Sequence, residues 1–492
     1  MDVFEWDEWG LVSAIALLAW VPFTFWLFSV ERPVKAAAHS LVWSMMWLPE
    51  GAAFDLPALP PFHKYSIAAI SVLLGLWWKA PKRLKAARIG RGYDWILLVM
   101  MLGQIGTVLT NPDPLHYGTY KTIDLPGFKP YDGLSAAVRV LISIGIPCMI
   151  GRAMLRTRRD LIDVMEVLVI GGLIYSLPIF YELRMSPMLH ENLYGFAPRS
   201  DWSQNMRAGG YRATVFMGHG LVVGFFMFLS TTCAIALRRA GKRRIWGVPM
   251  GFVIAYLGFT LLFCKAAAAV MYGAAAYVVI RYMGSKLRTR VYVLLAVVVI
   301  SYPLSRMFEF FPTTSILSAA ETLGPDRVQS LQFRFDNEDI LLLKASERMW
   351  FGWGGFSREH VYDSETAKDL VIQDGHWIAE FGMRGLVGFC CYFALMLLPV
   401  LRAPDAMRKV RLKRDQALLG GLGFMVVICS VNMLPNMELP TLQFVFAAGL
   451  AVLMKELPRQ AAAEITAANS GSQLPPPKRT RRPIRRGLQS AA

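Results

Sequence analysis

Long apolar runs alternate with clusters of Lys and Arg along this 492-residue chain. Several of the runs approach the roughly 20 residues that an α-helix needs to cross the hydrocarbon core of a bilayer, among them residues 11–30, 95–109, 291–304 and 386–401. The basic clusters lie between such runs, at residues 79–91, 152–159, 238–244, 281–290 and 402–414, and again after residue 455. They occupy every second loop, which is the charge pattern of loops that stay in the cytoplasm. The chain is therefore predicted to be a multi-pass membrane protein.

A segment in lipid must satisfy its own backbone hydrogen bonds, so only helices and closed barrels span a bilayer. Because the apolar runs have the length of helices, we predict an all-α transmembrane bundle of about thirteen spans. They lie near residues 10–30, 34–50, 64–79, 94–110, 134–151, 162–181, 216–237, 246–263, 266–283, 291–305, 379–401, 416–433 and 440–454. With the basic clusters inside, the N-terminus lies outside and the C-terminus is cytoplasmic.

The predicted spans divide the chain into four parts. Residues 1–306 form a transmembrane bundle with outer loops, residues 307–378 a large outer loop subdomain, residues 379–455 the C-terminal transmembrane helices, and residues 456–492 a disordered basic cytoplasmic tail. Within the large loop, residues 336–355 have the pattern of an amphipathic helix that ends at Gly352-Trp353-Gly354-Gly355. The tail is too polar to bury a core, and its charge predicts attraction to anionic lipids.

The net charge of +17 would favour nucleic-acid binding in a soluble protein. Here the charge lies in loops between apolar runs, so membrane topology explains it and no nucleic-acid partner is expected. All six cysteines fall inside apolar runs, where they behave as small hydrophobic residues. Because the sequence has no Walker motif, metal-ligand spacing or nucleophile elbow, we expect neither a metal nor another cofactor.

The basic residues outside the clusters gather in two predicted outer loops, where arginine outnumbers lysine. A guanidinium stays charged and binds phosphate oxygens through two parallel hydrogen bonds, so these arginines predict a phosphate-bearing ligand. The candidate ligand-binding residues are Arg207, Arg212, Arg334, Arg348 and Lys265, the last at the tight outer turn of residues 263–265. The alternative, equally favourable for any one arginine, is a local ion pair with Glu182, Glu191, Glu338, Asp339 or Glu347.

Three groups able to transfer protons lie where the eleventh predicted span begins: Asp374, His376 and Glu380. A histidine titrates near neutral pH, and a neighbouring carboxylate can orient it as a general base. The alternative is a polar residue at the membrane interface without a chemical role. His219, predicted to lie two residues into the helical part of the seventh span, has the same two interpretations.

Several short motifs resemble the O-antigen ligase and polymerase superfamily of bacterial glycan assembly. Arg334 is followed by Gly352-Trp353-Gly354 and then by Glu380-Phe381-Gly382-Met383-Arg384-Gly385 at the start of a span. The stretch 211–219 looks like that family's arginine-containing entry into a middle span. The segment 263–267 is similar to its small-basic-small start of a span, with lysine where arginine is usual. The likeness covers about residues 205–400.

The resemblance implies a metal-independent glycosyltransferase of the bacterial inner membrane, with the loop subdomain of residues 307–378 in the periplasm. It would take a glycan from undecaprenyl diphosphate and join it to an acceptor hydroxyl on a glycan or lipid, in surface or exopolysaccharide synthesis. Other polysaccharide assembly and export proteins would be its partners. By position, Arg212 and Arg334 would bind the diphosphate, whose negative charge grows as it departs.

The choice between ligase and polymerase stays open, because ligases of this family often carry a histidine-asparagine pair further before the glutamate than the Asp374-Gly375-His376 of this chain. The alternative from another class is a transporter or flippase for an anionic lipid-linked glycan or polymer. A transporter would place charges near the mid-bilayer and show repeated halves, whereas the basic residues here avoid span centres. A scaffold of polysaccharide export is opposed only by the concentration of outer arginines. For the enzyme, we expect Arg212, Arg334 and His376 to converge on one outer cavity.

Overall fold

The computed structural model describes residues 10–55, 60–87, 90, 92–119, 122–198, 202–207, 209–322, 324–436 and 441–469. Regular structure in these residues is predominantly helical, as the apolar runs predict. The helices are α1 (Gly10–Val30), α2 (Pro33–Trp47), α3 (Lys64–Lys79), α4 (Pro81–Ala86), α5 (Asp94–Leu109), α6 (Pro130–Val140), α7 (Ile146–Met154), α8 (Arg158–Met185), α9 (Leu189–Tyr194), α10 (Gly220–Arg239), α11 (Met250–Phe263), α12 (Ala267–Arg281), α13 (Ser285–Met307), α14 (Thr313–Glu321), α15 (Pro325–Ser346), α16 (His376–Leu401), α17 (Ala403–Lys409), α18 (Lys413–Asn432) and α19 (Leu442–Asn469).

Short strands pair locally between these helices. They form four two-stranded antiparallel sheets in the described residues: β1 (Ala53–Phe54) with β2 (Phe62–His63), β3 (Leu115–Tyr117) with β4 (Ile123–Leu125), β5 (Met206–Arg207) with β6 (Gly210–Tyr211), and β7 (Arg244–Ile245) with β8 (Val248–Pro249). A π-helical turn, η1 (Leu141–Gly145), joins α6 to α7, and a 3-10 turn, η2 (Trp202–Asn205), precedes β5.

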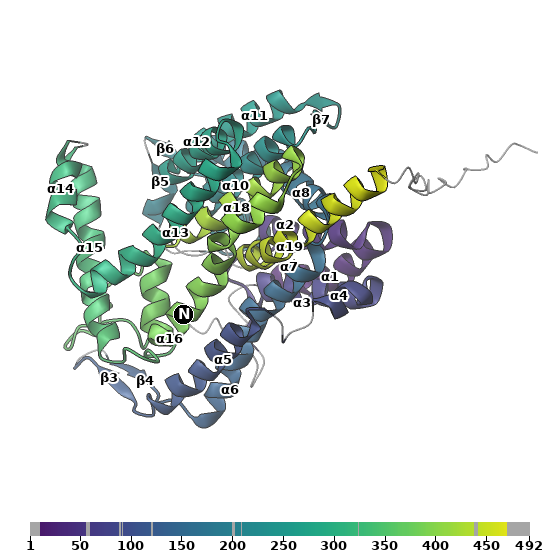
Figure 1. Cartoon of the computed structure of the whole chain (residues 1–492). Coiled ribbons are helices and arrows are strands. Elements are labelled where there is room, and N and C mark those ends of the chain that lie inside the picture. The colour runs from purple at the N-terminus through teal and green to yellow at the C-terminus, as the bar shows by residue number, and fades with distance from the viewer. Residues whose placement is uncertain are drawn as a thin grey trace, which may run out of the picture.

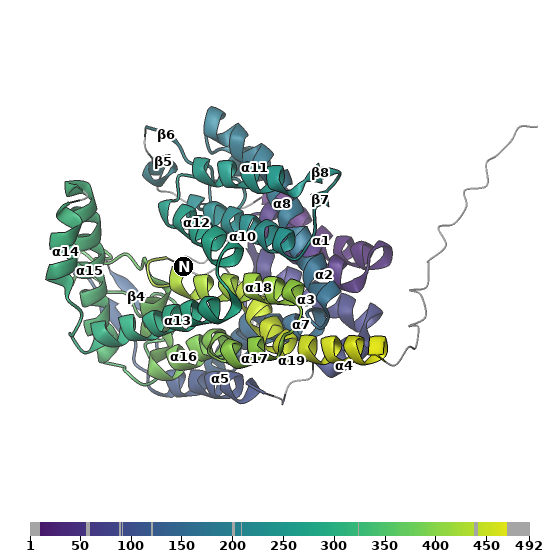
Figure 2. The same cartoon turned by 45° about the horizontal axis from the view of Figure 1, so that its top comes forward.

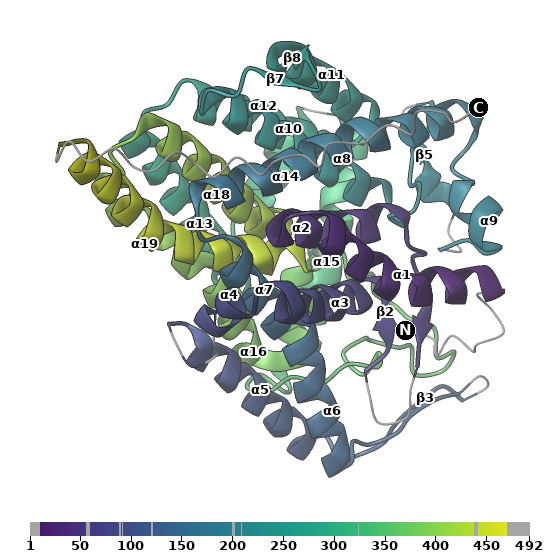
Figure 3. The same ribbon diagram turned by 90° about the vertical axis from the view of Figure 1, so that its right-hand side faces the viewer.

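Helices α10 and α18 form the centre of the bundle. In the most apolar stretch of each helix, 89% of the α10 residues and 83% of the α18 residues are buried, against 33% in α1 and in α13. Helix α10 is apolar on all sides, which is the composition expected of a helix surrounded by others. Figure 3 shows α5 and α6 at one edge of the bundle and α11 with the β7–β8 hairpin at the opposite edge.

Seven helical segments of the described residues are long and apolar enough to cross a membrane, and α5, α11 and α12 are apolar but shorter. A helix is present at each of the thirteen predicted spans. These findings support a membrane protein, while the full count of thirteen remains a prediction. Helix α16 also differs in its start, because it begins at His376, three residues before the predicted span.

The basic segments and the long loops lie at opposite ends of the bundle. Figures 1 and 2 both show α4, the β7–β8 hairpin and the end of α19 toward the right, and β5–β6, α14 and α15 toward the left. The separation agrees with the alternation of charge along the chain, since loops of one kind must return to one face of a membrane. We call these the basic end and the loop end.

Helix α19 continues well into the predicted tail, so the expectation of disorder from residue 456 is wrong up to Asn469. Side chains of this extension dock onto the basic end. Gln460 Nε2 donates to Arg156 O at 2.9 Å, and Glu464 accepts from Arg158 at 2.9 Å and from Arg414 at 3.0 Å. The segment is also rich in alanine, the residue with the highest helix propensity. Residues 470–492 of the predicted tail lie outside the described residues.

Helices α10 and α18 run antiparallel and are in close contact. Ala236, near the end of α10, packs on Gly421 early in α18, and three residues earlier in α10 the Cys233 Sγ lies 3.6 Å from Met425 Sδ, four residues later in α18. Each step toward the start of α10 is thus matched by a step toward the end of α18. The first residue of α10, Gly220, is therefore level with the residues that directly follow α18 at the loop end.

Helix α16 is broken at Gly385, whose φ is 59° and ψ is −167°. The break leaves backbone groups unpaired, and residues 349–354 fill it. Trp353 N donates to Gly382 O at 2.8 Å and Gly354 N to Met383 O at 2.9 Å. On the other side of the break, Leu386 N donates to Met349 O at 2.7 Å. The glycine-rich motif is thus a backbone insert into a helix, which satisfies groups that would otherwise be orphaned.

The amphipathic helix predicted at residues 336–355 is displaced in the structure. Helix α15 begins at Pro325 and ends at Ser346. Proline suits the first turn of a helix, and Gly324, with φ of 110°, supplies the turn before it. The helix must end early because residues 349–354 leave it to enter the break in α16. The large loop therefore packs into the bundle through this insert, while α14 and α15 project from it (Figure 1).

Candidate functional site

Arg212 lies in a buried, non-helical segment that leads into α10. The residue is 5% exposed, and its Nε is buried without a hydrogen-bond partner in the described part of the chain. A Cβ on Gly220 would lie 2.6 Å from this Nε, so the guanidinium rests against the first turn of α10. Burial, followed by the positive charge of Arg207, lowers the pKa of Arg212 to about 10. The guanidinium stays cationic at neutral pH and lies where helix amides make the potential positive.

Two further predicted cations join Arg212. Arg207 is on β5, and Lys265 occupies the α11–α12 turn with a left-handed φ of 51°. Lys265 Nζ donates to Arg207 O at 2.9 Å, which ties the turn to the β5–β6 hairpin. The structure therefore brings together Arg207, Arg212 and Lys265 from segments more than fifty residues apart. We call this group the Arg212 cradle.

His219 belongs to the same segment but not to the helical part of a span, contrary to the prediction. It is the N-cap of α10, and its Nδ1 accepts from Leu221 N at 3.1 Å. Its Nε2 lies 2.9 Å from Gln204 Oε1. A ring acceptor at this position satisfies one of the free amides of the first helical turn. The role of His219 in the structure is to cap α10.

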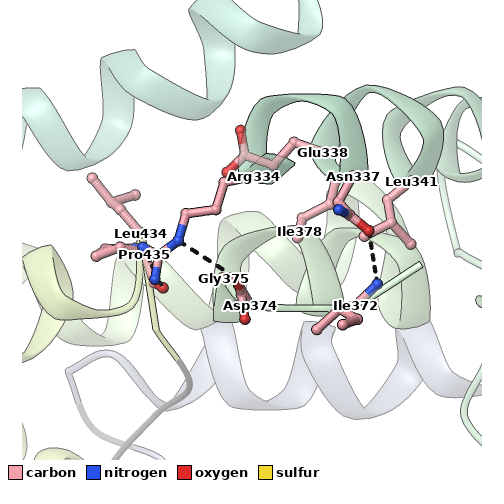
Figure 4. Close-up of a pocket in the computed structure, with 10 residues that line it drawn as sticks. All are labelled: Arg334, Asn337, Glu338, Leu341, Ile372, Asp374, Gly375, Ile378, Leu434 and Pro435. Atoms are coloured by element: carbon pink, nitrogen blue, oxygen red, sulfur yellow. Dashed lines mark hydrogen bonds and ion pairs between the residues drawn. The ribbon is translucent and has the colours of Figure 1, made fainter. Parts of the chain in front are cut away.

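Arg334 lies on α15 and reaches toward the end of α18. Its Nε is 3.5 Å from Asp374 Oδ2, and its Nη1 lies 3.5 Å from Pro435 O, as Figure 4 shows. These groups line a small pocket of about 20 Å³, room for about one water molecule. The pocket is lined by Arg334, Asn337, Glu338, Leu341, Ile372, Asp374, Gly375, Ile378, Leu434 and Pro435. We call it the Arg334 pocket.

Glu338 anchors the wall of the Arg334 pocket. Its carboxylate accepts from Tyr302 OH at 2.7 Å, from Arg306 Nε at 3.1 Å and from Trp377 Nε1 at 3.2 Å. Burial raises the pKa of Glu338, while these donors oppose the rise. The contacts join α13, α15 and α16, so the helix that carries Arg334 is held firmly. For Arg306, the local ion pair with Glu338 that the sequence offered as an alternative is confirmed, and Asp339 joins it at 2.8 Å.

His376 and Glu380 face away from the Arg334 pocket. His376 is 3% exposed, its ring lies 4.9 Å from the Tyr392 ring, and its Nε2 is 3.5 Å from Glu380 Oε1. Glu380 is 1% exposed and pairs with Arg384 one turn later. Of the three residues expected to converge, the Arg334 pocket therefore includes neither Arg212 nor His376, because the first turns of α16 point His376 into the bundle. Of the three predicted proton-transfer groups, only Asp374 lines the pocket.

Arg348 serves the loop instead of either candidate subsite. Its Nη1 donates to Thr110 O, its Nη2 is 3.8 Å from Asp113, and its guanidinium lies over the Trp353 ring. Arg358, which is 1% exposed, donates to Pro126 O at 2.8 Å. Both arginines thus hold the loop of residues 110–128 against the large loop. The contacts that the described residues show for Arg348 and Arg358 therefore all hold the loops together.

The Arg212 cradle and the Arg334 pocket lie at the same end of the bundle. Arg212 rests on the start of α10, and Arg334 touches Pro435 directly after α18. Because these helices run antiparallel, the start of α10 and the end of α18 both lie toward the loop end. The two arginines thus lie at one end of the bundle, although the pocket itself includes only Arg334.

Sequence reasoning missed two buried charges that shape the site. Lys64, at the start of α3, is 1% exposed, and Glu182, near the end of α8, is fully buried. Glu182 was expected, if anything, to pair with an arginine, but it binds backbone amides of the Arg212 segment. Lys64 stands alone before an apolar run in a predicted outer loop, and that isolation is the signal that could have singled it out.

Comparison of the sequence with protein-family models and with curated proteins found no match to either.

Proposed function

We propose that the chain is a membrane glycosyltransferase of the O-antigen ligase or polymerase kind, which moves a glycan from a lipid diphosphate to an acceptor hydroxyl at the loop end. The observation that carries the proposal is Arg212. A buried guanidinium without a carboxylate partner is unfavourable, and a bound anion would remove the penalty. The start of α10 beside it adds the positive end of a helix dipole, which favours an anion.

Arg334 on α15 supplies a second cation at the loop end, where it reaches Pro435 after α18. A diphosphate carries two anionic groups, and Arg212 and Arg334 offer it two guanidinium groups. Fixed guanidinium groups stabilise the charge that develops on the departing diphosphate, which is the main requirement of this transfer. The arginines of the two subsites suit that role, because a guanidinium keeps its charge and donates two parallel hydrogen bonds to phosphate oxygens.

Asp374 is the base that the geometry favours. It lines the Arg334 pocket with its side chain 41% exposed, whereas His376 and Glu380 are buried. When a donor phosphate takes over Arg334, the carboxylate is released to the acceptor. The acceptor oxygen then attacks the anomeric carbon, the bond to the diphosphate oxygen breaks, and Asp374 accepts the hydroxyl proton. The pocket must open for this step, and the 3.5 Å Arg334–Asp374 contact is loose enough to part.

The first experiment measures binding and transfer separately. Purified full-length protein is assayed for binding of a polyprenyl diphosphate and for glycan transfer, with Arg212→Gln, Arg334→Lys and Asp374→Asn as variants. Arg184→Gln, an exposed arginine at the loop end, is the matched control. We expect both site arginine variants to bind weakly and Asp374→Asn to bind normally without transfer. Wild-type binding and transfer in Arg212→Gln would refute the proposal.

The second experiment identifies the reaction from the lipid-linked intermediate that accumulates in a strain lacking this protein. Single lipid-linked repeats would indicate a polymerase, and full-length lipid-linked polymer would indicate a ligase. Lipid-linked glycan held on the cytoplasmic side would instead support the flippase alternative. His376→Ala belongs in the transfer assay as well, because loss of transfer there with Asp374→Asn active would move the base to the histidine.

A further inference from the structure

The segment that carries Arg212 adopts a conformation that its own residues do not favour. Residues 213–218 are buried and non-helical, and Val215 has a left-handed φ of 47°. A β-branched residue rarely adopts this conformation, because its Cβ substituents crowd the backbone. Contacts from outside the segment must therefore hold it in place.

Glu182 holds one side of the segment. Its Oε2 accepts from Thr214 N at 2.8 Å and from Val215 N at 2.7 Å, and its Oε1 accepts from Leu189 N at 3.1 Å. Three amides thus satisfy a fully buried carboxylate, in the way that a stable buried charge requires. Among the described residues Glu182 forms these amide contacts and no ion pair with Arg212.

Lys64 holds the other side. Its Nζ donates to Phe216 O at 2.8 Å and to Met45 O and Leu48 O at 3.3 and 3.4 Å, and it pairs with Glu50 at 2.8 Å. The lysine thereby links the end of α2, the start of α3 and the Arg212 segment. Between the two charges, Tyr175 OH accepts from Phe216 N at 3.1 Å. Backbone groups of three successive residues, Thr214, Val215 and Phe216, are therefore bound by side chains of α3 and α8.

We propose that Lys64 and Glu182 are positioning residues, which hold Arg212 against the start of α10 with its Nε free before any ligand arrives. The inference rests on the proposed function, because it treats Arg212 as the group that binds the donor diphosphate. Its physical basis is preorganisation: a guanidinium that is already ordered and desolvated loses less freedom on binding an anion. Glu182 only accepts and Lys64 only donates, so the two together bind both amides and a carbonyl of the same short segment.

The test is a double-mutant cycle on the full-length protein, with inorganic pyrophosphate and a polyprenyl diphosphate as probes. Lys64→Met, Arg212→Gln and the double variant are compared by dissociation constant, and thermal unfolding serves as the folding control. We expect Lys64→Met to weaken binding by on the order of 10-fold to 100-fold, the effect of a misplaced contact group. In the Arg212→Gln background the same change should have no further effect, because Lys64 acts only through the arginine.

Lys242→Met is the matched control for loss of a partly buried lysine. Lys242 pairs with Glu166 at the basic end, so its replacement should lower stability without altering pyrophosphate affinity. A purely structural role for Lys64 would make the two variants alike in affinity, which would overturn the inference. Equal losses from Lys64→Met with and without Arg212 would overturn it too.

A milder variant keeps the inference testable if Lys64→Met does not accumulate. Tyr175→Phe removes only the hydroxyl that accepts from Phe216 N and leaves the ring packed. We expect a several-fold loss of pyrophosphate affinity that again vanishes with Arg212→Gln, and unchanged affinity contradicts the positioning role. Failure of Arg212→Gln itself to alter affinity would instead refute the proposed function, so the two failures are distinguishable.

Discussion

Replacement of Gly385 tests whether the break in α16 is built into the fold. Its φ of 59° and ψ of −167° lie in a region that is nearly restricted to glycine. A Cβ there would also lie 2.5 Å from Phe351 N, a backbone atom that cannot rotate away. Backbone strain of about 1–3 kcal/mol and a steric overlap of about 1–3 kcal/mol act together. We therefore expect Gly385→Ala to lower the free energy of unfolding by roughly 2–6 kcal/mol.

The assay is thermal unfolding of the full-length protein in detergent, followed by tryptophan fluorescence. Gly352→Ala probes the other side of the insert, because its φ is 73° and its Cβ would lie 2.5 Å from Gly385 N. Gly355→Ala is the control from the same motif, since nothing lies within 4 Å of its Cβ, and its change should stay within about 0.5 kcal/mol. Wild-type stability of Gly385→Ala, or equal losses in Gly352→Ala and Gly355→Ala, would refute the pairing of the motif with the helix break.

Three further predictions address topology, pH and the outer loop. A reporter active only in the cytoplasm should be silent when fused after residue 360 and active after residue 470, and the reverse pattern would contradict the orientation. His190 accepts from Glu50 N at 3.0 Å, and burial lowers the pKa of His190 below the ordinary 6.5. The stability that neutral His190 contributes is therefore fully present above pH 6.5 and is lost as pH falls through the lowered pKa. Unfolding temperatures should therefore fall more steeply below pH 6.5 in the wild type than in His190→Gln, and parallel curves would exclude the histidine. Arg358→Met should cost about 2–4 kcal/mol by leaving loop carbonyls unpaired. It should also expose the chain near Pro126 to proteolysis, and equal digestion rates in the variant and the wild type would contradict this.

The general character of the protein was predictable from short stretches of sequence. Whether a run of residues enters a bilayer depends on its own apolar content, and whether a loop stays in the cytoplasm depends on its own basic residues. The tight turn around Lys265 and its proximity to Arg207 and Arg212 at the loop end also agree with the sequence. Helix bounds were less predictable, because α15 ends where the following residues enter the break in α16, and α19 continues past residue 456 where its side chains contact the basic end.

The roles of individual charges could not be predicted in this way. Glu182 is a plausible partner for any outer arginine in the sequence, yet it binds three amides in the structure. His376 and Asp374 are two residues apart, but the first turn of α16 sends one into the bundle and leaves the other in the pocket.

The sequence by itself determined an all-helical, membrane-type chain with its basic segments at one end and its arginine-bearing loops at the other. The reason is that helices in lipid satisfy their own backbone bonds, so hydropathy and charge act segment by segment. Only the tertiary structure decided that Gly352 and Trp353 fill a break in α16, and that Arg212 Nε has no partner among the described residues while a lysine and a glutamate bind the neighbours of Arg212. Those outcomes depend on which groups are left without a partner once helices from distant parts of the chain have packed. Burial then raises the free-energy cost of each unpaired charge, because the surrounding dielectric is low.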